Sequence, residues 1–237
     1  MQVADRSKPG SKVDFVRFKA LTFDCYGTLI DWETGLLEAM RPILAAHGHA
    51  PDDAQILDIY SQIEPQEQNP YRPYRQVLAN IVHRFGERLG FAVSEAEAKR
   101  LPDSLKNWPP FPDTVPALRR LSQRYELAII SNTDDDLFAG TARRLAIKFD
   151  QVITAEQAKA YKPSSAPFLL ALKRLGLAPH EVLHVGQSVY HDVLPAKALG
   201  LCTALVYRRG FGATRRTEGD PDVRVPDLET LANIAGA

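Results

Sequence analysis

Polar side chains that could do chemistry stand at four separate places in the chain. They are Asp24, the pair Ser131-Asn132, Lys162 and Asp192. Each is more often structural when it occurs alone, because an aspartate near a glycine is usually a turn residue and a lysine is usually solvated. All four nevertheless fall at or beyond the end of a short apolar run. Independent segments that supply polar groups to one crevice are typical of active sites in open α/β sheets, so the set predicts an active site.

The apolar runs that precede these residues predict the strands of a parallel sheet. Each run stops at a polar or glycine-containing turn. The predicted strands cover residues 20–23, 127–130, 151–154, 182–185 and 202–207. Helical patterns lie between them, over residues 115–121, 168–175 and 193–199. This alternation predicts an α/β fold, a Rossmann-like parallel sheet with helices on both faces.

The stretch 32–108 differs because it contains helical patterns and no convincing strand. Breaks are expected at Pro65, around Asn69-Pro70 and in the proline-rich segment 108–112. We interpret this stretch as a helical cap inserted after the first strand, where it would cover the site and exclude water. The chain is predicted to comprise a core of 13–31 and 109–237, a cap of 32–108, and a flexible tail of 1–12.

Composition restricts the class of protein. The chain has 237 residues, 45% of them hydrophobic and 24% charged, which is ordinary globular composition. Its 29 basic and 29 acidic residues give no net charge, so a nucleic-acid partner is not expected. It contains no apolar run long enough to span a bilayer and no signal-peptide pattern at its start, so a membrane partner is not expected either. Its two cysteines fit a reducing cytoplasm, and a homodimer is left open.

Four ordered motifs resemble those of the haloacid dehalogenase superfamily. The first is the segment Phe23-Asp24-Cys25-Tyr26-Gly27-Thr28-Leu29. The others are Ile130-Ser131-Asn132, Tyr161-Lys162-Pro163, and Val185-Gly186-Gln187-Ser188 leading to Asp192. The resemblance covers residues 18–209, and the helical insertion between the first two motifs matches the cap of this superfamily.

The resemblance implies a role for each catalytic candidate. Asp24 would be the nucleophile, because a carboxylate can form an ester that water then cleaves. Ser131 would donate a hydrogen bond to that carboxylate. Lys162 would stay protonated beside it, lower its pKa and keep it anionic. Asp192 would hold Lys162 and a water, or take part in metal binding.

Two departures from the superfamily pattern point to the 2-haloacid dehalogenase branch, which needs no cofactor. Phosphatases of the superfamily carry a second aspartate two residues after the nucleophile, where this chain has Tyr26. They also usually carry Gly-Asp in the last motif, where this chain has Gln187. Halide needs no proton to leave, so the loss of a general acid does no harm to a dehalogenase. The alternative is a magnesium-dependent phosphatase, with the ion on Asp24, the Tyr26 carbonyl and Asp192.

The expected substrate is a small organic anion, yet the residues that would bind it match the branch only in part. Asn132 would help to hold halide, and Gln62 falls where the branch has a pocket glutamine. The arginine of the branch that binds the substrate carboxylate or halide would fall at Ser61. Phe168 replaces a tyrosine of the branch, and Ser188 completes the predicted substrate-binding set. The mismatch leaves open a third hypothesis, a non-catalytic member that binds a small acid or a protein.

Other charged residues offer a positive charge or resemble known sites. Arg72 or Arg75 could supply the charge that Ser61 lacks. The pairs Arg208-Arg209 and Arg215-Arg216 could attract anionic substrates, although solvated loops are the commoner explanation. The run Asp134-Asp135-Asp136 is expected to begin a helix rather than bind metal.

Three residues near the motifs are set aside. Cys25 and His184 are expected to pack in the core. His191 is not expected to form a catalytic pair with the adjacent Asp192, since neighbours in a helix point to different faces.

Overall fold

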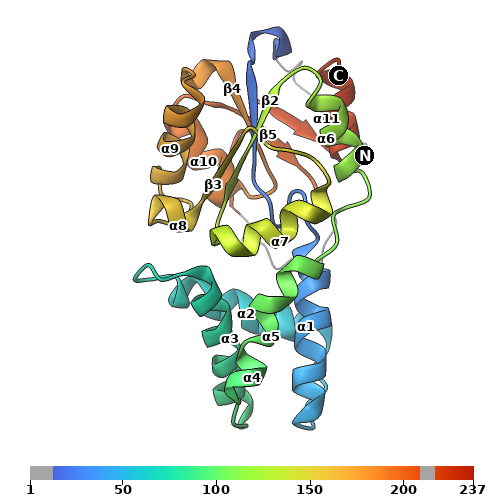
Figure 1. Cartoon of the computed structure of the whole chain (residues 1–237), viewed down its shortest axis with the longest axis vertical. Coiled ribbons are helices and arrows are strands. Elements are labelled where there is room, and N and C mark those ends of the chain that lie inside the picture. Colours follow the sequence, from blue (N-terminus) through green and yellow to red (C-terminus); the bar gives the residue numbers. More distant parts are fainter. Residues whose placement is uncertain (1–12, 209–216) are drawn as a thin grey trace, which may run out of the picture.

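A six-stranded sheet and the helices packed on its two faces form the larger part of the molecule. The computed structural model describes residues 13–208 and 217–237 (Figure 1). The strand order is β3-β2-β1-β4-β5-β6, and every neighbouring pair is parallel. The strands are β1 Ala20–Phe23, β2 Glu126–Ser131, β3 Gln151–Thr154, β4 Val182–Gly186, β5 Cys202–Val206 and β6 Val223–Val225. The predicted α/β fold is confirmed, while the expected tail of residues 1–12 lies outside the described residues.

Helices cover both faces of the sheet because successive side chains of each strand point to opposite sides. On β1, Leu21 and Phe23 pack in the cluster that includes α6, α7 and α11, whereas Ala20 packs on the other face with α9 and α10. The core helices are α6 Thr114–Leu121, α7 Asp135–Leu145, α8 Ala155–Ala158, α9 Ala166–Leu175, α10 Leu194–Ala198 and α11 Leu228–Ile234. Short 3₁₀ turns are η1 Phe15–Arg17 and η3 Pro179–Glu181, and Val189–Val193 is a π-helical turn, η4.

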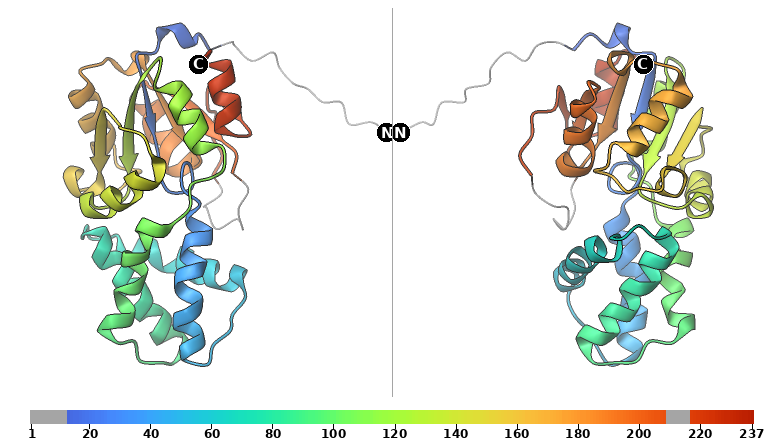
Figure 2. Two further views of the ribbon diagram at one scale, coloured as in Figure 1. Left: turned by 45° about the vertical axis from the view of Figure 1, so that its right-hand side comes forward. Right: turned by 90° about the vertical axis from the view of Figure 1, so that its left-hand side faces the viewer.

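A group of helices lies beyond one end of the sheet (Figures 1 and 2). Its members are α1 Trp32–Ala46, α2 Asp53–Glu67, α3 Tyr74–Leu89, α4 Glu95–Ala98, α5 Arg100–Ser104 and the 3₁₀ turn η2 Leu105–Asn107. We call these helices the cap. Its interior is continuous with the apolar core, since Leu36, Ile81 and Phe85 belong to the same buried cluster as Phe23. Within the described residues, no helix is both long and apolar enough to cross a membrane.

The chain enters and leaves the cap through two paired segments. The Asp31 N–H donates to the Pro109 carbonyl at 2.8 Å, and the Phe111 N–H donates to the Leu29 carbonyl at 3.0 Å. An antiparallel bridge between Ile30 and Pro110 lies between these bonds. The two crossings therefore form one hydrogen-bonded connection rather than two independent linkers.

A second contact joins the core to the start of α3. The carboxylate of Asp134, the residue before α7, accepts hydrogen bonds from the Tyr74 and Arg75 N–H groups, both at 2.8 Å. The residue that precedes α3, Pro73, makes no side-chain cap of its own. The sequence predicts that Asp134 begins a helix, and it does precede α7, but its carboxylate caps α3 instead. A core side chain thus satisfies the first amide groups of a cap helix.

One predicted break is wrong, and several elements, β6 and α11 among them, are not predicted. Helix α2 continues through Pro65 and ends two residues later at Glu67. A proline in the last turn removes only its own amide bond, which a helix end tolerates better than a helix centre. Strand β6 and helix α11 follow the last predicted strand and complete the sheet edge and one face.

Candidate active site

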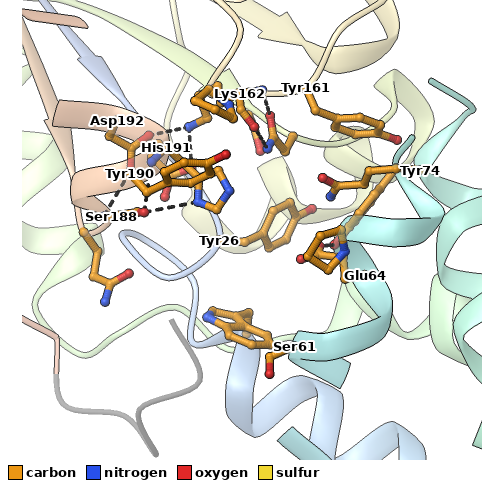
Figure 3. A pocket seen from close by; sticks show the side chains of 18 of the residues that line it. Tyr26, Ser61, Glu64, Tyr74, Tyr161, Lys162, Ser188, Tyr190, His191 and Asp192 are labelled. Atoms are coloured by element: carbon orange, nitrogen blue, oxygen red, sulfur yellow. Dashed lines mark hydrogen bonds and ion pairs between the residues drawn. The ribbon is translucent and has the colours of Figure 1, made fainter. Parts of the chain in front are cut away.

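A cavity of about 730 Å³ lies between the carboxyl ends of the strands and the cap. The candidates from all four motifs line it: Asp24, Ser131, Asn132, Lys162, Ser188 and Asp192. Figure 3 shows Lys162, His191 and Asp192 on one side of this cavity, and Glu64 and Tyr74, from cap helices, on the other. The structure therefore brings the predicted polar groups together at the edge of the sheet, as the open α/β architecture requires.

Lys162 is the centre of the polar network. Its Nζ donates to Asp24 Oδ1 at 2.8 Å, to Asp192 Oδ1 at 2.7 Å and to the Ile130 carbonyl at 2.9 Å. The side chains of Lys162 and Asp192 are 1% exposed, whereas that of Asp24 is 13% exposed. All three protons of the ammonium are thus used, and Asp24 is the carboxylate that remains open to a ligand.

Burial and charge set the protonation of these three groups. Burial raises the pKa of Asp24 above its usual 3.8, although Lys162 and the Thr28 hydroxyl oppose the rise. Burial alone would lower the pKa of Lys162, but the two carboxylates raise it above 10.5, so the ammonium stays charged at neutral pH. Burial would likewise raise the pKa of Asp192, but Lys162 and His184 outweigh it and hold the pKa below its usual value. Lys162 lowers the pKa of Asp24 as expected, but desolvation outweighs its effect, so the pKa still lies above the usual value.

The hydroxyl that orients Asp24 is not the expected one. Thr28 Oγ1 donates to Asp24 Oδ2 at 2.7 Å and accepts the Gln187 N–H at 2.9 Å. Ser131 is buried and lines the cavity, but its Oγ makes no hydrogen bond to any described residue. The tight turn after Asp24 returns Thr28 to the carboxylate, so Thr28 takes the place predicted for Ser131.

Asn132 holds the lysine loop in place. Its Oδ1 accepts the Lys162 N–H at 2.7 Å, and its Nδ2 donates to the Lys162 carbonyl at 3.1 Å. This reciprocal pair fixes the backbone from which the ammonium extends. Its side chain also lines the cavity, so a contact with a leaving halide stays a prediction.

The Tyr26 hydroxyl bonds to the Thr141 hydroxyl of α7 at 2.8 Å. Burial raises the pKa of Tyr26 far above its usual 10. Its ring packs edge-on against Trp108, with centroids 5.6 Å apart, and lines the cavity. The group at the position of the phosphatase acid is therefore a wall of the cavity and a poor proton donor.

The π-helical turn η4 brings a histidine to the cavity that the sequence does not predict there. Ser188 Oγ lies 3.1 Å from His191 Nδ1 and accepts the His191 N–H, also at 3.1 Å. His191 and Asp192 both line the cavity, and burial lowers the pKa of His191 below 6.5. His184 is buried as expected, but its Nε2 also lies 3.4 Å from Asp192 Oδ1. His184 therefore contacts the predicted catalytic residue Asp192, and His191 lies in the cavity wall beside it.

Two expected substrate-binding residues lie elsewhere. Gln62 is exposed on α2, where it bonds to Asp58 and to Arg88. Phe168 is fully buried between α9 and the sheet and packs edge-on against His184. Neither belongs to the described cavity lining, whereas Ser61 does. On α2, the cavity is therefore lined by Ser61 and not by its neighbour Gln62, which was expected there.

The arginines that could bind an anion are paired elsewhere. Arg72 bonds to Glu67 at 2.6 Å, and Arg75 bonds to Asp103 and Asp136. Arg208 Nη1 donates to both carboxylate oxygens of Asp113, at 2.7 and 2.9 Å. The rest of the predicted basic cluster, Arg209, Arg215 and Arg216, lies outside the described residues. Lys162 is consequently the only lysine or arginine among the described lining residues.

The donor set does not match a magnesium site. Asp24 and Asp192 each accept a hydrogen bond from Lys162, and Asp192 Oδ2 also accepts the Ser188 N–H at 3.2 Å. Gln187 supplies no carboxylate. Magnesium prefers a nearly octahedral set of oxygen ligands, and here the two carboxylates face an ammonium.

The cap side of the cavity carries further groups that the motifs do not reveal. Tyr or Trp side chains make up eight of the described lining residues, and Glu64 on α2 is the one cap carboxylate among them. Periodicity alone assigns such aromatic residues to a packed core, so the sequence offers no signal that they face a cavity.

Comparisons with known proteins identify similar hydrolases. The haloacid dehalogenase-like hydrolase family matches residues 18–200. An (S)-2-haloacid dehalogenase of Pseudomonas putida is 27% identical over 91% of this chain and 95% of that protein. A phosphoglycolate phosphatase of Pseudomonas aeruginosa is 28% identical over 92% of this chain and 79% of that protein.

A crystal structure of an L-2-haloacid dehalogenase superposes with a TM-score of 0.80 at 28% identity, covering 93% of this chain and all of that one. Fold, motif order and cap thus agree with the match over residues 18–200. The chain belongs to the haloacid dehalogenase-like hydrolase family.

Proposed function

We propose that this hydrolase displaces halide from a saturated carbon without a metal ion, using Asp24 as nucleophile. An Asp24 oxygen attacks the carbon, the carbon–halogen bond breaks, and halide leaves with the bonding electrons. Water then adds to the Asp24 carboxyl carbon, and the acyl–oxygen bond breaks to release an alcohol. The net reaction consumes one water and releases one proton with the halide.

The observation that supports this proposal best is the pairing of Asp24 with Lys162, together with the lack of an acidic proton donor at Tyr26, two residues after Asp24. Lys162 Nζ lies 2.8 Å from Asp24 Oδ1, whereas the Tyr26 hydroxyl is bonded to Thr141. A halide leaving group needs no general acid, while an alcohol leaving group does. The arrangement therefore suits carbon–halogen cleavage better than phosphate ester cleavage. A cytoplasmic location belongs to the same proposal, supported by two free cysteines.

Halide release is the direct test. Because relatives are named as (S)-2-haloacid dehalogenases, the first compound to try is (S)-2-chloropropionate, which would give a 2-hydroxy acid. Haloalkanes that carry neutral or cationic groups follow. We expect halide release in the presence of EDTA at the same rate as without it. The phosphatase alternative predicts the opposite: magnesium-dependent phosphate release from an aryl phosphate, which stops with EDTA.

Isotope labelling tests the intermediate. In a single turnover in ¹⁸O-water, the alcohol should carry ¹⁶O and the peptide that contains Asp24 should gain ¹⁸O. Direct attack of water on the carbon would instead label the alcohol and leave Asp24 unlabelled, which would remove the nucleophilic role.

A further inference from the structure

Glu64 places a negative charge in the wall of the cavity on the cap side. Its Oε1 accepts hydrogen bonds from the Tyr60 and Tyr74 hydroxyls, both at 2.9 Å. The two hydroxyl oxygens lie 3.0 Å apart, so the three groups form a compact cluster. Burial raises the pKa of both tyrosines well above 10, which keeps them protonated as donors. The cluster fixes the Glu64 carboxylate in one orientation within the cavity wall (Figure 3).

Glu64 has no cationic partner among the described residues. Its second oxygen, Oε2, accepts no hydrogen bond from them, and the nearby Arg72 is paired with Glu67. Lys162 uses its three protons on Asp24, Asp192 and a backbone carbonyl. The described lining thus contains three carboxylates and one ammonium, and a substrate carboxylate would add a fourth negative charge to a confined space.

Aromatic rings surround the same part of the cavity. Trp32 and Tyr60 have centroids 5.2 Å apart, and Tyr71 and Tyr161 have centroids 5.4 Å apart. The Tyr71 hydroxyl oxygen is buried, without a hydrogen-bond partner in the described part of the chain, and its residue lines the cavity. The faces of such rings attract cations, and a hydroxyl oxygen can accept a hydrogen bond from an ammonium.

We propose that the substrate of this enzyme carries an organic ammonium group, which Glu64 and the surrounding aromatic rings bind while Asp24 attacks the other end. This inference rests on the proposed function for the reacting end alone. The ammonium would donate to Glu64 Oε2 and would contact ring faces that a carboxylate avoids. The presence of Ser61 where the dehalogenase branch has an arginine fits this proposal, because a substrate that is an amine rather than an acid needs no cationic partner there.

Binding of small, unreactive ligands tests the proposal without any turnover. The chain contains two tryptophans, Trp32 and Trp108, and both line the cavity, so intrinsic fluorescence reports its occupation. The probes are butylammonium, butyramide and butyrate, which share a chain and differ in charge, at constant ionic strength. We expect butylammonium to bind about 10-fold or more tightly than butyrate, with butyramide between them.

Variants of Glu64 assign the preference. Glu64→Gln removes the charge and should reduce the preference for butylammonium about 10-fold, whereas Glu64→Asp should retain part of it. Glu87→Gln is the matched control, because Glu87 is an exposed residue of α3 that pairs with Arg84. The proposal is wrong if butyrate binds as tightly as butylammonium, if Glu64→Gln keeps the preference, or if millimolar butylammonium leaves the fluorescence unchanged. Since Asp24 chemistry is not measured, failure of the dehalogenase proposal would not produce any of these results.

Discussion

Lys162 stabilises two carboxylates at once, and this explains the protonation of the whole site. Its ammonium lies within 2.8 Å of both Asp24 and Asp192, so neither carboxylate has the full charge of a partner to itself. Asp192, which His184 also supports, keeps a low pKa, whereas burial dominates at Asp24. Asp24, the proposed nucleophile, is thus less acidic than an exposed aspartate, and a less acidic carboxylate is a better nucleophile once ionised.

The first prediction concerns Asp24. Asp24→Asn keeps the shape of the side chain and removes the nucleophile, so turnover should fall at least about 10³-fold. The variant should remain folded, which thermal melting checks on the same sample. Near-normal turnover in freshly prepared protein, with deamidation excluded by mass spectrometry, would end the assignment of Asp24.

The second prediction concerns the pH dependence of Lys162→Met. In the proposed reaction Asp24 attacks only when ionised, so activity should rise with pH through the Asp24 pKa, which already lies above 3.8. Without the ammonium this pKa should rise further, and the acid limb of the kcat/KM profile should move to higher pH. The maximal rate should fall by about 100-fold or more. The exposed Lys173→Met on α9 is the control, and an unchanged profile for Lys162→Met would place Lys162 outside the reaction.

Helix α1 packs closely against Trp108, and this contact depends on a small residue in the helix. Gly35 in α1 faces the ring of Trp108, and a Cβ at this position would lie 2.2 Å from Trp108 Cγ. The ring has little freedom to move, since its Nε1 donates to Ser104 Oγ at 2.9 Å and its edge packs against Tyr26. One helix glycine therefore positions a wall of the cavity.

The third prediction follows from this contact. Gly35→Ala should lower the free energy of unfolding by about 1–3 kcal/mol, although alanine is the better helix former. Urea denaturation measures the change. In the Trp108→Ala background the same substitution should cost much less, because the ring that it meets is gone. Equal costs in the two backgrounds would show that the contact does not limit packing.

Sequence patterns predict the sheet better than the cavity, for physical reasons. Strands such as Ala20–Phe23 and Gln151–Thr154 are short apolar runs that end at turns, and their pattern is local. The face of α2 that meets the core depends on tertiary packing, so Glu64 is missed and Gln62 is misplaced. Strand Val223–Val225 has three residues, too few for a periodic signal. The motifs identify Asp24, Lys162 and Asp192 because each follows a strand end.

The whole molecule depends on how the cap is held against the core. The Asp134 carboxylate accepts hydrogen bonds from two backbone amide groups at the start of α3. Just before that helix, the Tyr161 hydroxyl donates a hydrogen bond to the Arg72 carbonyl at 2.7 Å. Arg75 adds an exposed ion pair with Asp136. Because Tyr74 also bonds to Glu64, this junction links the core to the carboxylate of the cavity.

The fourth prediction compares two neighbouring aspartates of this junction. Asp134→Asn should lower the free energy of unfolding by about 2 kcal/mol, since a buried charged acceptor of two amide groups is lost. Asp136→Asn removes only an exposed ion pair and should cost less than about 1 kcal/mol. Denaturation curves measure both, and a raised KM for Asp134→Asn alone would show that the junction also shapes the cavity. Similar costs for the two variants would contradict the capping role.

The Asp134 contact also has a consequence for chimeric enzymes. Because the acceptor belongs to the core and the amide groups belong to the cap, the third cap helix is not a self-sufficient unit. If this cap were grafted onto another core, the Tyr74 and Arg75 N–H groups would lose Asp134 as their acceptor unless that core supplied an equivalent carboxylate. Recombination of specificities between family members therefore has to exchange the loop between β2 and α7 together with the cap.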